Sequence, residues 1–159
     1  MDASSYSAEE HYRQGEKALG EERESAALEH FRTAHRLDPT SARYRSYYGL
    51  GLALAERRFD KALELCRSAA KEEFFNPALY RNLARVHLAF GFKAEGIRYL
   101  RRGLMIDPAD EGINADLSDL GVRRRPILGF LSRRHGLNRA LGRLRGRLFA
   151  GPPPEPFNV

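Results

Sequence analysis

A period of 34 to 35 residues constrains the fold of this chain more than any other feature of its sequence. Leu37-Asp38-Pro39 recurs as Ile106-Asp107-Pro108, and each tripeptide closes a stretch with apolar residues at helical spacing. We therefore divide the chain into three segments, 8–41, 42–76 and 77–110, and number the positions within each segment. Internal repeats of this length build arrays in which each unit buries its apolar face against its neighbours.

Small residues recur at fixed positions of the three segments. Two helices can approach closely only where the facing side chains are small, so the pattern predicts one antiparallel helix pair in each segment. The middle segment has one extra residue, which we place in its internal turn near Arg57. With that allowance the small residues are Gly15, Gly49 and Ala84 at position 8, Ala27, Ala62 and Gly96 at position 20, and Ala34, Ala69 and Gly103 at position 27, while position 24 holds Phe31, Cys66 and Leu100.

Helix starts agree with this division. Ser7-Ala8-Glu9-Glu10 has the pattern of a capping box, in which the serine and the second glutamate cap each other's backbone. Asn76-Pro77 and Asp107-Pro108 each place a capping side chain before a proline suited to the first helical turn. Residues 111–121 carry apolar side chains on one side only, which predicts a helix that caps the open end of the array and ends at Gly121.

The combination of this period with small residues at positions 8, 20 and 27 and proline at position 32 resembles the tetratricopeptide repeat (TPR). The resemblance covers residues 8–110, with Phe74 in place of the proline in the middle segment. Position 11, often tyrosine in the family, is Ala18, Leu52 and His87 here. The resemblance implies an all-α fold, a right-handed superhelical solenoid of antiparallel helix pairs.

The resemblance also implies a groove lined by the first helix of each repeat, which would hold a peptide or helical segment of another protein. TPR domains that hold chaperone C-termini use a clamp of lysine and asparagine, and Tyr12 and Glu16 stand where its first two members would be. That class of ligand is therefore disfavoured. The groove residues implied are Tyr12, Glu16, Arg43, Ser46, Leu50, Arg81, Arg85 and Leu88.

A basic tail follows the repeats. Nine arginines and no acid lie between Gly121 and Gly151, so the formal net charge of +6 comes from the tail, and residues 1–120 have 18 bases against 20 acids. We divide the remainder into a lead, 1–7, an amphipathic tail, 122–151, and a proline-rich end, 152–159. We expect an apolar stripe in the tail to pack on the chain's own repeats or to fold on a partner. Its predicted contact residues are Leu137, Leu141, Leu144 and Leu148, with Arg139, Arg143 and Arg147 beside them.

The sequence shows no pattern of catalytic or metal-binding residues. Five histidines are scattered without metal-ligand spacing, and we expect His87 to be a packed core residue. Cys66 is the one cysteine, so it excludes an intrachain disulfide, and we expect a small buried apolar side chain. Gly49-Leu50-Gly51 lacks the rest of a phosphate loop. We therefore predict no enzyme, no cofactor, no metal and no small-molecule substrate.

These features favour an adaptor or scaffold that binds another protein, as a subunit of a larger bacterial assembly. One alternative is docking of the tail onto an anionic membrane surface, or onto nucleic acid, which the scarcity of aromatic residues in the tail disfavours. Another is a secretion-type chaperone, since three repeats in this length resemble the type III translocator chaperones, which we associate with acidic chains. The N-terminus lacks a signal-peptide pattern and no apolar run is long enough to span a bilayer, so we expect a cytoplasmic protein.

Overall fold

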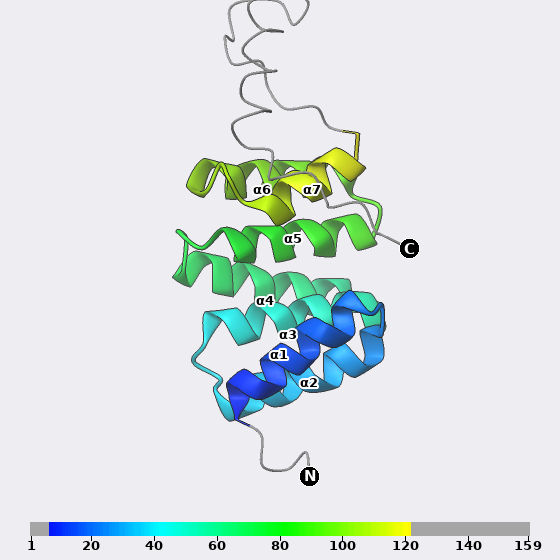
Figure 1. Cartoon of the computed structure of the whole chain (residues 1–159), viewed down its shortest axis with the longest axis vertical. Coiled ribbons are helices and arrows are strands. Elements are labelled where there is room, and N and C mark those ends of the chain that lie inside the picture. Colours follow the sequence, from blue (N-terminus) through cyan, green and yellow to red (C-terminus); the bar gives the residue numbers. More distant parts are fainter. Residues whose placement is uncertain (1–6, 122–159) are drawn as a thin grey trace, which may run out of the picture. The chain divides into compact units, whose positions relative to one another are not determined.

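The computed structural model describes residues 7–121 of the 159-residue chain, and within them seven helices and no strand are present. Six helices form three antiparallel pairs, α1 with α2, α3 with α4 and α5 with α6, and the last helix packs on α6 (Figure 1). The first helices begin at Ala8, Ala42 and Pro77, the first residues of the three expected repeats. The bounds are α1 Ala8–Gly20, α2 Glu24–Leu37, α3 Ala42–Ala55, α4 Phe59–Glu72, α5 Pro77–Ala89, α6 Lys93–Ile106 and α7 Glu111–Asp119.

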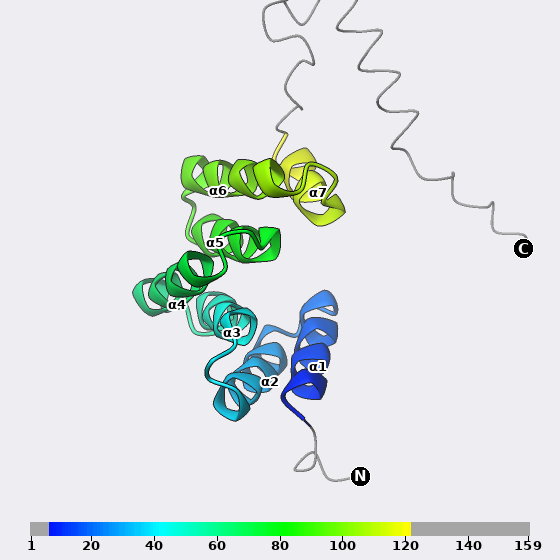
Figure 2. The same cartoon turned by 90° about the vertical axis from the view of Figure 1, so that its left-hand side faces the viewer.

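The helix pairs of residues 7–121 stack into a curved array. Figure 2 shows the helices along an arc, with the first helices α1, α3 and α5 and helix α7 on its inner side and the second helices α2, α4 and α6 on its outer side. Helices α1 and α7 are the first and last helices of this arc. We call the surface on its inner side the inner face. The expected amphipathic tail, 122–151, with its predicted leucine and arginine contacts, and the proline-rich end, 152–159, lie outside the described residues.

Local side-chain caps fix where the first helices begin. The Ser7 side chain accepts a hydrogen bond from the Glu10 backbone N–H, and Glu10 accepts one from the Ser7 N–H, so the predicted capping box is confirmed. Asn76 caps α5 ahead of Pro77, also as predicted. The expectation for Asp107 is wrong: its carboxylate accepts from Ala109 N–H in a turn, and Asp110 caps α7.

Small residues stand where the paired helices approach most closely. A Cβ atom on Gly15 would lie 2.5 Å from the Phe31 ring, and one on Gly49 would lie 2.9 Å from both the Ala62 carbonyl oxygen and the Cys66 sulfur. The position-24 side chains are fully buried in all three pairs. The predicted close approach of the paired helices at position 8 is therefore confirmed for the first two pairs, where the position-24 side chain lies against position 8 of its own pair.

The turn inside each helix pair has three residues, 21–23, 56–58 and 90–92. Their central residues, Glu22, Arg57 and Gly91, all have positive φ angles, of 58°, 56° and 81°. The expectation that the extra residue of the middle repeat lies in the turn is wrong, because the three turns are equal in length. It lies in α3, which has 14 residues where α1 and α5 have 13.

Candidate functional site

Successive first helices are joined by one recurring contact. In each case the side chain at position 5 of one repeat touches the side chain at position 6 of the next unit along the chain. The contact is aromatic between α1 and α3, a buried hydrogen bond between α3 and α5, and an ion pair between α5 and α7. The three pairs are Tyr12 with Tyr47, Ser46 with Asn82, and Arg81 with Asp116.

The two polar pairs show why these contacts hold the stack together. Ser46 and Asn82 are buried, and the Asn82 amide donates to the Ser46 hydroxyl at 3.1 Å. Arg81 donates from Nε and Nη2 to the two oxygens of Asp116, at 2.7 and 2.9 Å. A planar guanidinium matches a carboxylate in this two-point geometry, so the pair fixes the orientation of α7 on α5.

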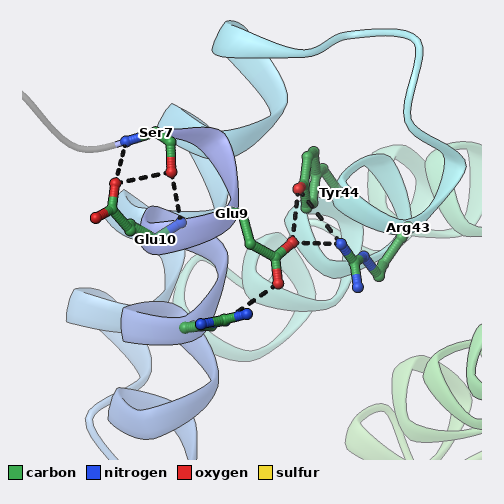
Figure 3. A network of polar contacts seen from close by, with 6 residues as sticks. Ser7, Glu9, Glu10, Arg43 and Tyr44 are labelled. Atoms are coloured by element: carbon green, nitrogen blue, oxygen red, sulfur yellow. Dashed lines mark hydrogen bonds and ion pairs between the residues drawn. The ribbon is translucent and has the colours of Figure 1, made fainter.

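A second polar network joins α1 to α3 at the edge of the inner face. Figure 3 shows Glu9 directed from α1 toward Arg43 and Tyr44 on α3, where it accepts hydrogen bonds from the Arg43 guanidinium and, at 2.9 Å, from the Tyr44 hydroxyl. These contacts lower the pKa of the Glu9 carboxyl, chiefly through the Tyr44 hydrogen bond and then through the Arg43 charge. Arg43 also lies over the Tyr12 ring, 4.5 Å from its centroid. Its guanidinium therefore already has two contacts within the fold, the Glu9 carboxylate and the Tyr12 ring.

Two phenols and one carboxylate meet beside this network. The rings of Tyr12 on α1 and Tyr47 on α3 pack edge to face with centroids 5.0 Å apart. Burial raises the pKa of both phenols, and the neighbouring Glu16 carboxylate raises both further. Glu16 itself is exposed. At its α1 end the inner face therefore combines an exposed carboxylate, Glu16, with the aromatic pair Tyr12 and Tyr47.

Arg85 supplies the opposite charge on the α5 side. It lies one helical turn after Arg81, so both side chains project from the same side of α5. Arg85 is partly buried, and it forms no ion pair with any carboxylate of residues 7–121. Burial and the like charge of Arg81 lower the pKa of the Arg85 guanidinium. The nearest opposite charges act only from a distance, because Asp116 is already held by Arg81.

The structure separates the predicted groove residues into three sets. Tyr12, Ser46 and Leu50 are buried, with 6%, 0% and 0% of their surfaces exposed, so they cannot offer a partner much contact and are corrected to packing residues. The reason is that positions 5 and 9 of a central helix face the next first helix as well as the inner face. Arg43 and Arg81 stand on the inner face but are bound to Glu9 and Asp116.

Two predicted groove residues remain available as charged contacts, and a third is only partly so. Glu16 and Arg85 are not used in ion pairs that join the helices of residues 7–121. Leu88 is partly exposed, but its side chain covers Gly96 on α6, where an added Cβ would lie 2.7 Å from it. Leu88 therefore belongs mainly to the packing within the third pair.

Sequence reasoning missed Tyr47 and Asp116. Both occupy position 6, one residue beyond the positions that the resemblance implied for the groove. A signal was present, because position 6 is polar or aromatic in every unit, as Arg13, Tyr47, Asn82 and Asp116. Comparing the residue types at position 6 across the repeats would have indicated the recurring contact.

The cysteine and the histidine singled out in the sequence are enclosed in the core of the described residues. Cys66 and His87 are 0% and 4% exposed, which confirms the two expectations of burial. Burial raises the pKa of the Cys66 thiol to about 12, so it is a neutral thiol at physiological pH. Within residues 7–121 no three His, Cys, Asp or Glu side chains gather as metal ligands, and no helix there is long and apolar enough to cross a bilayer.

Comparison with solved structures identifies this arrangement of helices. The chain resembles the TPR domain of OM64 from Arabidopsis, with a TM-score of 0.54 and 18% sequence identity over 71% of this chain and 93% of that one. It also resembles the crystal structure of MamA, with a TM-score of 0.50 and 18% identity over 73% of this chain and 70% of that one. No protein-family model and no curated protein matches the sequence significantly. The likenesses show that the chain has the TPR fold, and the predicted fold class is confirmed.

Proposed function

We propose that this chain is a non-enzymatic adaptor that holds a segment of another protein on its inner face. The observation that carries the proposal is Arg85 of α5, a cation with no ion pair among residues 7–121, on the same face as the exposed Glu16 carboxylate beside the Tyr12 and Tyr47 phenols. A partly buried cation without a partner costs free energy in the folded protein. Such a group is typical of a surface shaped for a ligand rather than for stability.

The contacts between first helices support the same function. Position-5 and position-6 side chains join α1, α3, α5 and α7, so the inner face is fixed before a partner arrives. A preorganised surface loses less conformational freedom on binding than a flexible one. An extended or helical segment could then contact several first helices at once. We place this adaptor in a larger bacterial assembly in the cytoplasm, in line with the sequence-based expectation.

Site-specific photocrosslinking tests the proposal. A photoreactive benzoylphenylalanine replaces Glu16 on the inner face, and the matched control replaces Ser68, an exposed residue of the second helix α4. The full chain is irradiated in a lysate of its native host. We expect a discrete crosslinked species from position 16 and none at the same mass from position 68. Equal crosslinking from both positions would contradict binding on the inner face.

A second candidate function rests on the tail. The nine arginines of the stretch from Gly121 to Gly151 would attract an anionic membrane surface. Binding of the full chain to phosphatidylserine vesicles, measured at 50 and 200 mM salt, separates the two candidates. Docking by the tail weakens steeply with salt, whereas a segment held on the inner face by aromatic and apolar contacts depends on salt far less.

A further inference from the structure

We infer that the inner face recognises a carboxylate of its partner segment, and that Arg85 is the residue that binds it. The inference rests on the proposed function and names the chemistry of the partner: an acidic side chain, aspartate or glutamate, at one fixed position of the bound segment. It comes from comparing two arginines on the same side of α5, of which one is matched within the fold and the other is not.

Arg81 is an arginine of the same side of α5 whose charge is neutralised within the fold. Its guanidinium binds both oxygens of Asp116, and the pair has a structural role in holding α7. Arg85 also lies near Asp116 and Tyr47, but it forms no such pair among residues 7–121. Four groups face it: Arg81 on its own helix, Asp116 on α7, Tyr47 on α3 and Glu24 at the start of α2. None of them forms an ion pair with it.

The location of Arg85 explains why a partner would reach it. The groups that act on its charge come from α2, α3, α5 and α7, so a segment bound at the guanidinium would lie near more than one helix. A chain segment that crosses this face passes over the Tyr47 ring and the Arg85 head together. Tyrosine and arginine in a partly dehydrated setting are the residue types that contribute most to binding energy at interfaces.

The surrounding charges favour a carboxylate over a phosphate. Asp116 on α7 and Glu24 at the start of α2 act on the same site, and both would repel a doubly charged group more than a singly charged one. A carboxylate matches the guanidinium with two parallel hydrogen bonds, as Asp116 does for Arg81. One acidic side chain therefore neutralises Arg85 at the lowest electrostatic cost.

Selection from a random peptide library tests the inference without knowledge of the natural partner. Dodecapeptides displayed on phage are selected on the full chain and, in parallel, on the Arg85→Gln, Arg85→Lys and Arg67→Gln variants. Arg67 is an exposed arginine of α4, so its variant has the same loss of charge on the opposite face. Dissociation constants of the selected peptides are then measured for each variant.

We expect peptides selected on the native chain to share an aspartate or glutamate. Their affinity should fall by about 30-fold or more for Arg85→Gln, the lower end of the range for truncating one member of a buried charge pair. It should be partly retained by Arg85→Lys and unchanged by Arg67→Gln. Replacing the shared acid of the peptide by its amide should weaken binding to the native chain but not to Arg85→Gln.

Other outcomes of the selection would contradict either the inference or the proposed function, and the two cases can be distinguished. Peptides that bind the inner face without a shared acid, or that bind Arg85→Gln as well as the native chain, would overturn the inference and leave the proposed function standing. Failure of every variant to select any peptide would count against the proposed function itself. The same peptides are also measured on Glu155→Gln, which removes the one acid of the proline-rich end, 152–159. A gain in affinity there would show that this carboxylate is the occupant and would overturn recognition of a partner's acid.

Discussion

Arg81 of α5 and Asp116 of α7 form a two-point ion pair, with hydrogen bonds of 2.7 and 2.9 Å. One helical turn further along the same side of α5, Arg85 has no such partner among residues 7–121. The two arginines of α5 therefore differ in their contacts within the fold. Arg81 holds the last helix in place, and Arg85 is the residue that we propose binds a group from outside the fold.

This difference predicts opposite effects of the same substitution. Arg81→Met leaves Asp116 without its partner and should lower the free energy of unfolding by about 1 kcal/mol, a value reduced by the partial exposure of the pair. Arg85→Met removes a cation that has no ion pair among residues 7–121 from a partly buried position, and should leave stability unchanged or raise it. Chemical denaturation monitored by circular dichroism measures both. A loss from Arg85→Met equal to that from Arg81→Met would show that both arginines are structural.

The fold could be read from the sequence because its signals repeat. Gly15 and Gly49 are conspicuous only as members of one column, and each is placed opposite a bulky residue by helical geometry. Caps such as Ser7 and Asn76 are equally local and equally readable. Asp107 misled because an aspartate before proline fits both a turn and a helix start, and the choice depends on where the next helix packs.

The candidate site was less predictable, because side-chain exposure depends on contacts between repeats. Leu50 and Glu16 share position 9, yet Leu50 is fully buried while Glu16, at the end of the stack, is exposed. Position numbers alone cannot separate them. The role of Arg81 required knowledge of Asp116, 35 residues away.

Two glycines of α1 should respond in opposite directions to alanine. At Gly15 the new methyl group would lie 2.5 Å from the Phe31 ring, whereas at Gly20 it meets nothing within 4 Å. Gly15→Ala should destabilise the protein by about 1–2 kcal/mol, the cost of overpacking less the gain in helix propensity. Gly20→Ala should stabilise it by up to about 1 kcal/mol. Thermal unfolding of the two variants checks the sign, and a stabilised Gly15→Ala would mean that α1 and α2 do not approach so closely.

The turns inside the helix pairs predict a second pair of opposite effects. Glu22 has a φ of 58°, which is unfavourable for a residue with a Cβ, and Gly91 occupies the same place in the third turn with a φ of 81°. Glu22→Gly should therefore raise the free energy of unfolding by about 0.5–1 kcal/mol, and Gly91→Ala should lower it by about 1 kcal/mol. No atom lies within 4 Å of a Cβ on Gly91, so the loss would come from the backbone alone. Urea denaturation measures both changes, and stabilisation by Gly91→Ala would contradict the turn conformation.

The last prediction concerns pH and His87, which is buried between α5 and α6 with its ring stacked on Tyr99. Neither of its ring nitrogens has a hydrogen bond within residues 7–121. Burial lowers the pKa of His87 below its ordinary value near 6.5, and the neighbouring Arg67 charge lowers it further. The folded state therefore prefers the neutral ring, whereas the unfolded chain takes up a proton near pH 6.5. Stability should be constant above that pH and should decrease as the pH falls below it toward the folded pKa, because the unfolded chain then binds more protons. His30 and His35, whose pKa values burial also lowers, should add to the decrease.

Urea midpoints measured from pH 7.5 to 5.0 test this, with His87→Leu as the control that should show a weaker dependence. Equal pH dependence in the two proteins would mean that His87 does not titrate on unfolding in this range.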